Sequence, residues 1–396
     1  MRLLHTSDWH LGRSFGPVPL LDDQRAMGEW LVATAVDERV DLVVVAGDVY
    51  DRAIPPTAAI ELLRDTLQRL QAARIRTVVI SGNHDSSERL AAYGGLTDQS
   101  GIHVRGGYHR AGEVLPLEFD DGPLDVVALP YLDPVLAPLD RVGPPAPGDE
   151  PDTAARRWRA THQAVLAQAA GVAKAARRAP RSRAVAHALV VSGAGAPGLV
   201  RSDSERELTV GGTGAVDVSV FDGFSYSALG HLHAPQLVGG RANVRYCGSP
   251  LAYSFSEQAP KQVLLVELAP DGSTEVQPLA VPCGRGVCQV TGTIDELLAE
   301  VRADAVDRFV KAVLTDAGPV VDAKVRLQQR YPWVCEIELR PERPAGTTAS
   351  AGHAGERRSL SPAAAADAYW HDLFGTAPDH DEAELLVRML DEAVRG

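Results

Sequence analysis

The feature that most constrains the fold is an alternation of short apolar runs with helical segments over the first 135 residues. Strands are predicted at RLLHTS near the start and at residues 41–48 (DLVVVAGD), 76–85 and 124–132. Helices are predicted at 22–40 and 56–73, the second with Ile60, Leu63, Leu67 and Leu70 on one face. This alternation is typical of an α/β fold, in which sites gather beyond the carboxyl ends of the strands.

The rest of the chain divides by composition. A Pro/Gly-rich loop is predicted at 137–155, followed by a helix at about 156–178, a strand at 183–193, a long loop at 194–218, and strands at 224–233, 242–250 and 262–268. The predicted domains are 1–275, a small α/β unit at 280–340, a linker at 341–361 and two short amphipathic helices in 362–396. In the last helix, Leu385, Leu386, Met389 and Leu390 are expected on one face.

Length and charge limit the functional classes. The 396 residues carry a net charge of −13, which argues against binding nucleic acid by bulk charge alone. An enzyme that uses bound cations and a partner subunit for the phosphates stays compatible with that charge. Cys247, Cys283, Cys288 and Cys335 fit no zinc template and are expected to be reduced thiols of a cytoplasmic protein. We expect no signal peptide and no membrane span.

Polar residues follow the apolar runs. They are Asp8 and His10 in SDWH, Asp48 in GDVYD, Asn83 and His84 in GNHD, His187 in VAHALVVSG, and His231 and His233 in GHLH. Residues two apart on an extended strand share a side, so the first and last pairs are expected to converge. A single histidine is more often a core residue, and an Asp after Gly is more often a turn residue. Five strand ends that all offer oxygen or nitrogen donors favour a metal site instead.

Two divalent ions account for this set. Asp8, His10, Asp48 and His233 are predicted to hold one ion, and Asp48, Asn83, His187 and His231 the other, with Asp48 as the bridge. The mixed donors suit manganese, iron or zinc, and the lack of thiolates disfavours a structural zinc site. Such a pair activates water and neutralises the charge of a phosphodiester.

Neighbouring residues have predicted supporting roles. His84 need not be a ligand and is expected to protonate the leaving oxygen or stabilise the transition state. For Asp85 two alternatives stay open: orienting the His84 imidazole, or capping the helix that follows. Gly47, Gly82 and Gly230 are expected to allow tight turns.

As a set, these motifs resemble the calcineurin-like metallophosphoesterases. Within that family, the chain resembles more specifically the nuclease subunits of SbcCD-type complexes. The segments that carry this resemblance are TSDWHLG, SERELTVGG (204–212), ALGHLHAPQ (228–236) and YCGSPLAYSFSE (246–257), followed by Lys261. The motifs span about residues 1–270. Asp51 departs from relatives that carry a histidine there, and its role stays open.

The resemblance implies a two-sheet α/β fold with helices, a capping domain at 280–340, and C-terminal helices that dock on the coiled-coil base of an SbcC-type, SMC-like ATPase. It implies manganese-dependent 3′–5′ exonuclease activity on duplex DNA and endonuclease activity on single strands and hairpins, gated by the partner's ATP cycle. His84 would be the catalytic histidine. Helices near 57–70 and 86–96 would form a homodimer within a heterotetramer that acts in DNA repair in the cytoplasm, at the nucleoid.

Three other functions share parts of this pattern. A serine/threonine phosphatase is suggested by GDVYDR, where Arg52 would clamp a phosphate monoester. A small-molecule or cyclic-nucleotide phosphodiesterase would share the core motifs, but the length and the helical tail weigh against it. A non-catalytic scaffold would have a damaged ligand set, whereas all eight positions are intact.

Overall fold

The computed structural model describes residues 1–138, 160–193, 199–205 and 214–341, together with 364, 366–367, 370–371 and 376–395. The chain separates into one unit over Met1–Arg340 and a second over Pro341–Gly396. The predicted loop at 137–155 and the predicted linker at 341–361 fall almost wholly outside the described residues, as does most of 362–375.

The first large sheet has six strands in the order β16-β15-β1-β4-β5-β6. Its strands are β1 (Arg2–Thr6), β4 (Leu42–Ala46), β5 (Arg76–Ile80), β6 (Ile102–Arg105), β15 (Gln262–Leu268) and β16 (Thr274–Ala280). The run from β1 to β6 is parallel, and β15 joins β1 in antiparallel register. Every residue of β4 is buried, as expected for a central parallel strand covered on both faces.

The second large sheet also has six strands, in the order β13-β14-β12-β9-β8-β7. Its strands are β7 (Val114–Phe119), β8 (Gly122–Leu129), β9 (Ser182–His187), β12 (Tyr226–Gly230), β13 (Gln236–Val238) and β14 (Arg241–Tyr246). Strands β8, β9, β12 and β14 are parallel. Two small pairs complete the strands of this region: β2 (Ser14–Phe15) with β3 (Val18–Pro19), and β10 (Leu189–Val191) with β11 (Ala215–Asp217).

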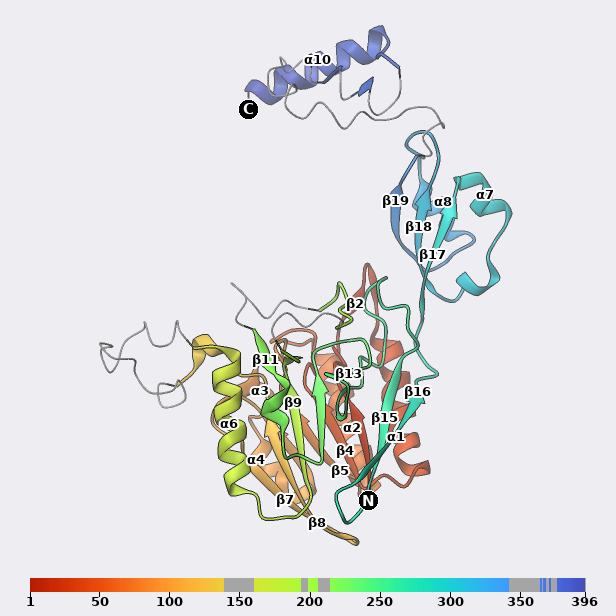
Figure 1. Cartoon of the computed structure of the whole chain (residues 1–396). Coiled ribbons are helices and arrows are strands. Elements are labelled where there is room, and N and C mark those ends of the chain that lie inside the picture. Colours follow the sequence, from red (N-terminus) through yellow and green to blue (C-terminus); the bar gives the residue numbers. More distant parts are fainter. Residues whose placement is uncertain are drawn as a thin grey trace, which may run out of the picture. The chain divides into compact units, whose positions relative to one another are not determined.

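Helices cover the outer face of each sheet, giving the layers helix, sheet, sheet, helix (Figure 1). Helices α1 (Leu21–Asp37) and α2 (Thr57–Ala72) pack on the first sheet, and α6 (His162–Ala176) packs on the second. Short helices α3 (Ser87–Leu90) and α4 (Gly94–Thr97) precede β6. A third apolar cluster fills the space between the sheets. The α/β prediction is therefore confirmed.

A three-stranded parallel sheet follows, with a core of its own. It consists of β17 (Val287–Gly292), β18 (Phe309–Leu314) and β19 (Val334–Leu339), with helices α7 (Ile294–Ala299) and α8 (Ala323–Gln328). Phe309 stacks on Phe15 with ring centroids 4.3 Å apart, so this sheet contacts the β2–β3 hairpin. The division into domains at 275 and 280 stays a prediction.

The second unit contains α10 (His380–Arg395), where Leu385 and Met389 are exposed and Leu386 is half-buried. Among the described residues, no helix is both long enough and apolar enough to cross a membrane.

On α2 the predicted apolar face lies at the edge of the buried one: Leu63 and Leu70 are buried, whereas Ile60 is 46% exposed, because the face that meets the sheet is centred on Ala59, Leu62 and Thr66. One secondary-structure prediction was wrong in detail. The predicted loop at 194–218 contains strand β11, which pairs with β10.

Candidate metal centre

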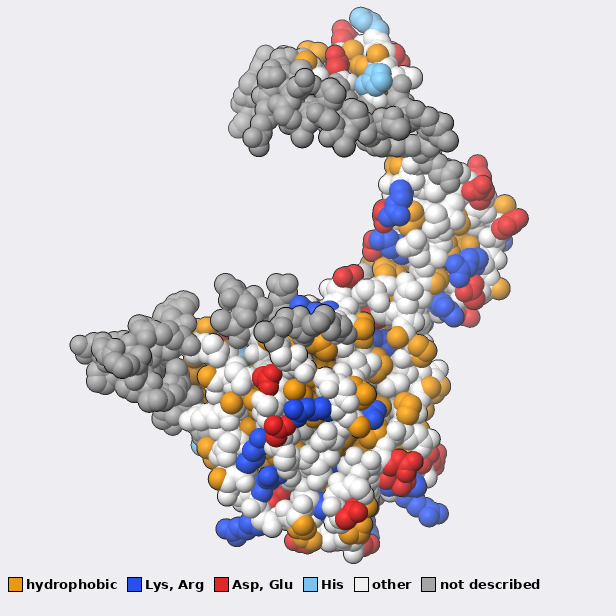
Figure 2. Space-filling model, viewed as in Figure 1, with side chains coloured by type: hydrophobic (Ala, Val, Ile, Leu, Met, Phe, Trp, Pro, Cys, Tyr) orange, Lys and Arg blue, Asp and Glu red, His pale blue; other side chains and the backbone are white. Residues whose placement is uncertain are grey.

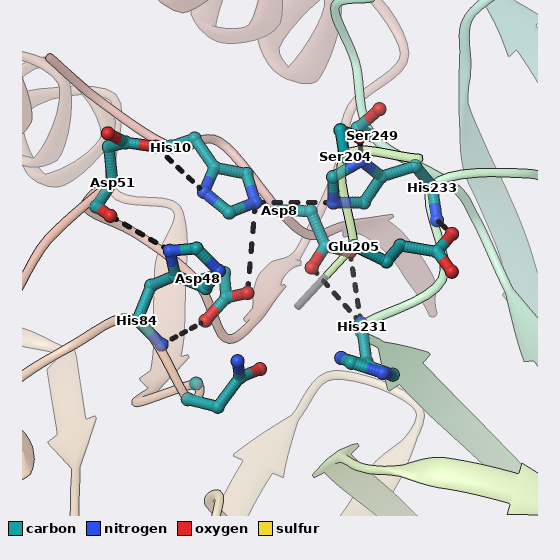
Figure 3. A network of polar contacts seen from close by, with 12 residues as sticks. Asp8, His10, Asp48, Asp51, His84, Ser204, Glu205, His231, His233 and Ser249 are labelled. Carbon is teal, nitrogen blue, oxygen red and sulfur yellow. Dashed lines mark hydrogen bonds and ion pairs between the residues drawn. The ribbon is translucent and has the colours of Figure 1, made fainter. Parts of the chain in front are cut away.

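Five strands of the two large sheets bring their carboxyl ends to one place. Asp8 and His10 follow β1, Asp48 follows β4, and Asn83 and His84 follow β5, all in the first sheet. From the second sheet come His187, the last residue of β9, and His231 and His233, which follow β12. Figure 3 shows the labelled members of this set turned toward one another.

The paired residues converge by a different local geometry from the one predicted. Strand β1 ends at Thr6 and β12 at Gly230, so neither pair lies on an extended strand. Asp8, His10 and Asp48 have φ values of 54°, 44° and 47°, in the left-handed region, and His231 has a φ of 113°. Non-glycine residues seldom adopt such angles, and they persist at functional sites because the surroundings hold them there.

Backbone hydrogen bonds hold these loops side by side. The amide of Asp8 donates to the Gly47 carbonyl, and the amide of His10 donates to the Asp48 carbonyl, each at 3.0 Å. The Asp8 carboxylate in turn accepts the His231 amide at 3.0 Å, which links the two sheets.

The three glycines beside the site act mainly through close approach. A Cβ on Gly230 would lie 1.8 Å from the Ala46 carbonyl oxygen, and one on Gly82 would lie 2.1 Å from Asp48 Oδ1. Only Gly47 has a positive φ, 88°, and a Cβ there would also meet the His187 ring. The prediction of tight turns therefore holds for Gly47, while Gly82 and Gly230 leave room for neighbouring atoms.

Among the residues that the structure describes, three overlapping groups of side chains have ligand atoms within 4.8 Å of one another. They are Asp8, His10 and His233; Asp8, Asp48 and His187; and His10, Asp48 and His84. Asp48 Oδ2 lies 3.7 Å from His10 Nε2 and 3.5 Å from His187 Nε2, so one carboxylate reaches both halves of the site. The ligand assignments of the sequence analysis stay predictions.

The donor set fits cations because bare lone pairs face one another. His187 Nδ1 lies 2.9 Å from the Ala46 carbonyl and therefore carries the hydrogen, yet its Nε2 lies 2.9 Å from Asn83 Oδ1, a second acceptor. His10 Nε2 and His233 Nε2 are 3.2 Å apart. The His231 Nε2 atom is buried without a partner among the described residues. A positive charge between these atoms would satisfy all of them.

The pKa shifts of the site residues also indicate that the site favours a positive charge. Burial alone would raise the pKa of Asp48, but His187 beside it holds that pKa well below its ordinary value. Burial opposes charge on His187, yet the Asp48 carboxylate raises the pKa of His187 to about 9, so that without a metal ion a proton on Nε2 supplies the positive charge. For Asp8, burial raises the pKa. The pocket therefore stabilises a cation next to Asp48.

His84 is held by its backbone and one ring nitrogen. Its amide donates to Asp48 Oδ1 and its Nδ1 donates to the Asp51 carbonyl, at 2.9 and 2.8 Å. Its ring meets the His10 ring edge to face, with centroids 4.7 Å apart. Because a carbonyl only accepts, Nδ1 carries the hydrogen and Nε2 is left for proton transfer.

Both alternatives for Asp85 were wrong. Its carboxylate accepts the amides of Gly82, Val49 and Tyr50 at 2.8, 3.1 and 2.9 Å, and so fastens the loop after β4 to the loop after β5. Helix α3 begins after Ser86 without a side-chain cap.

Several residues around His233 were missed by the sequence analysis. Glu257 Oε1 lies 3.1 Å from His233 Nδ1, and Ser204 Oγ lies 2.7 Å from the same nitrogen. Glu205 Oε1 accepts the His233 amide at 2.8 Å. Burial opposes the charge of Glu257, but His233 and Lys261 hold its pKa well below the usual range. The segments SERE and SFSE stand out in the sequence only through the family resemblance, since no spacing rule links them to His233.

Comparisons with known proteins point to one family. Residues 1–133 match the family model of the calcineurin-like phosphoesterases. The chain is similar to SbcD, a component of nuclease SbcCD, from Bacillus subtilis (strain 168), with 34% identity covering 75% of this chain and 76% of the relative. It is 31% identical to the Escherichia coli (strain K12) protein of that name, over 76% and 73% of the two chains. The Rhodobacter capsulatus protein is 34% identical over 96% and 93%.

Proposed function

Since the chain belongs to the SbcD family of nuclease subunits, we propose that it hydrolyses DNA phosphodiester bonds at this centre with two manganese ions. The observation that carries the proposal is the set of facing lone pairs at the ends of five strands, which calls for cations. The proposed activities are 3′–5′ exonuclease on duplex ends and endonuclease on hairpins and single strands.

The residues divide between the two ions as follows. We assign Asp8, His10, Asp48 and His233 to the first site, and Asp48, Asn83, His187 and His231 to the second. When bound, the ions would supply Lewis acidity, which neutralises the scissile phosphate and makes an attacking water more acidic. Asp8 is within reach of His187 as well, so it lies close to both sites.

His84 is the proposed proton donor to the leaving oxygen. Its Nδ1–H is fixed by the Asp51 carbonyl, so the imidazolium form presents its second proton, on Nε2, in one orientation. The side chain is partly exposed, as that of Asn83 is, whereas the other proposed ligands are buried, and a substrate oxygen can therefore reach it. A positioned general acid of this kind contributes about 10²–10⁴-fold to the rate.

Charge favours a nuclease that shares its DNA contacts with a partner. On the face in Figure 2, the described basic and acidic side chains are interspersed among neutral and apolar ones, without a continuous basic band. With a net charge of −13, the chain would gain DNA affinity from its cations and from an SbcC-type ATPase. We place this complex in the cytoplasm, at the nucleoid, in DNA break repair.

The helical tail is the proposed docking segment for the ATPase. Helix α10 exposes Leu385, Val387 and Met389. Deleting residues 362–396 should abolish co-purification with the ATPase while manganese-dependent cleavage of single strands is kept. A complex that survives the deletion would reject this docking site.

A homodimer is proposed through the surface around α2 and α3. Ile54, Tyr93 and Leu96 are largely exposed there, beside a pocket of about 440 Å³. Replacing Leu96 by Glu should shift the mass measured by light scattering from dimer to monomer. An unchanged mass would place the dimer face elsewhere.

The deciding experiment is cleavage of end-labelled duplex by the purified chain, alone and with the ATPase, in manganese, in magnesium and after chelation. We expect cleavage in manganese and none after chelation. A cyclic nucleotide and an aryl phosphate monoester serve as competing substrates. Faster turnover of either of them than of DNA would assign the site to a small-molecule phosphodiesterase or a phosphatase.

A further inference from the structure

A buried carboxylate lies behind one of the proposed ligands. The Glu257 side chain is 2% exposed, and its oxygens contact His233, Ser204, Ser249 and Lys261. Figure 3 shows Ser204, Ser249 and His233 gathered on the side of the site away from Asp48. A carboxylate this enclosed needs all of these donors, because a buried charge without partners is strongly unfavourable.

The hydrogen bonds fix where the proton of His233 resides. Lys261 Nζ donates to Glu257 and, at 2.9 Å, to Ser249 Oγ, so it balances the carboxylate charge. Ser204 Oγ donates to Glu257, which leaves its lone pairs free to accept. His233 Nδ1 therefore carries the hydrogen and shares it between Ser204 Oγ and Glu257 Oε1, at 2.7 and 3.1 Å.

This arrangement leaves His233 Nε2 with a bare lone pair facing the site, 3.2 Å from His10 Nε2. We propose that Glu257, neutralised by Lys261 and assisted by Ser204, is a positioning residue that sets the tautomer and orientation of His233 for the first metal ion. The inference rests on the proposed metal centre and adds the groups that tune one of its halves. A carboxylate behind a metal-binding imidazole raises the basicity of that ligand, and its loss weakens metal affinity about 10–100-fold.

The test compares three variants of the full chain. Glu257→Gln removes the charge, and Ser204→Ala removes one acceptor of the Nδ1 hydrogen while keeping the carboxylate. Asp125→Asn is the matched control, because Asp125 is a buried carboxylate that accepts the amides of Arg178 and Ala179 and contacts no proposed ligand. It faces the start of β9, whereas His187 ends that strand.

Manganese binding to the metal-free chains is followed by electron paramagnetic resonance. We expect two ions in the unaltered chain, a 10–100-fold loss of affinity at one of the two sites in Glu257→Gln, a loss of a few fold at the same site in Ser204→Ala, and no change in Asp125→Asn. The inference would be overturned if both sites in Glu257→Gln and in Ser204→Ala bound manganese with the same affinity as in the unaltered chain. Should Glu257→Gln not fold, Ser204→Ala decides.

A metal-free readout separates this inference from the proposed function. The ¹⁵N shifts of labelled imidazoles should show the Nδ1–H tautomer for His233, and Glu257→Gln should move that signal alone among the site histidines. Failure of the unaltered chain to bind manganese would reject the proposed function. An Nε2–H tautomer in that chain would reject the role of Glu257, whatever the metal result.

Discussion

The two halves of the candidate centre are supported in different ways. In the first half, His10 and His233 have side-chain carboxylates behind their Nδ1 atoms: Asp51 at 3.6 Å and Glu257 at 3.1 Å. In the second half, His187 is held by a backbone carbonyl, that of Ala46, at 2.9 Å. Side chains can be exchanged without moving the strands, whereas the Ala46 carbonyl is part of β4. We therefore expect the first half to be tunable by substitution and the second to be fixed by the fold.

The largest effect should come from the residue that the halves share. Asp48→Ala removes the carboxylate next to both His10 and His187, so both ions should be lost together. Without the ions, the transition state loses several kcal/mol of charge stabilisation, so the rate of hydrolysis should fall by more than about 10³-fold. Metal content by mass spectrometry measures the first outcome. One tightly bound ion left in the variant would argue against a bridge, and Asp125→Ala controls for loss of a buried carboxylate.

The second largest effect should come from His84, which belongs to neither half. His84→Gln should keep two ions and lose about 10²–10⁴-fold in turnover, because only the proton donor is removed. Anomalous scattering from a manganese-soaked crystal counts the ions. His103→Gln is the matched control, since His103 pairs with Asp98 away from the centre. A missing ion in His84→Gln would make His84 a ligand instead.

Only part of the centre could be predicted from the sequence. The short apolar runs placed the strand ends, and parallel strands bring such ends together, so the gathering of Asp8, Asp48 and His187 was predictable. The left-handed backbone at Asp8 and His10 was not, because it depends on hydrogen bonds to the loop after β4. Glu257 was not either, since no sequence spacing links it to His233.

A smaller effect should separate the two supporting carboxylates of the first half. Asp51 is farther from its histidine than Glu257 is, and it also pairs with Arg13 at 3.2 Å. Asp51→Asn should therefore lower the affinity for the first ion by about 10-fold, which is less than the loss expected in Glu257→Gln. The Asp51 carbonyl that holds His84 is kept, so turnover at saturating manganese should stay unchanged. A titration of activity against manganese measures both quantities, and a lower plateau would contradict this division of roles.

The smallest effect concerns a buried histidine outside the centre. His5 differs from the site histidines because the protein satisfies both of its nitrogens: Nε2 donates to the Leu229 carbonyl at 3.1 Å, and Nδ1 accepts from Tyr226 Oη at 2.9 Å. Burial lowers the pKa of His5 to about 3, against 6.5 in an unfolded chain. The unfolded chain therefore binds the proton first, and the stability that neutral His5 contributes is complete above pH 6.5 and is lost as the pH falls toward 3.

His5→Gln isolates this contribution, because a glutamine amide can also donate to one group and accept from the other without titrating. Between pH 7 and pH 5, the free energy of unfolding should fall by about 2 kcal/mol more in the unaltered chain than in His5→Gln. Denaturant unfolding in chelator measures it, since titration of the other histidines is common to both chains and cancels. If the free energy of unfolding depended on pH in the same way in both chains, His5 would take up its proton as readily in the folded protein as in the unfolded chain. His5 would then not differ from the histidines of the centre in the way that its two hydrogen bonds imply.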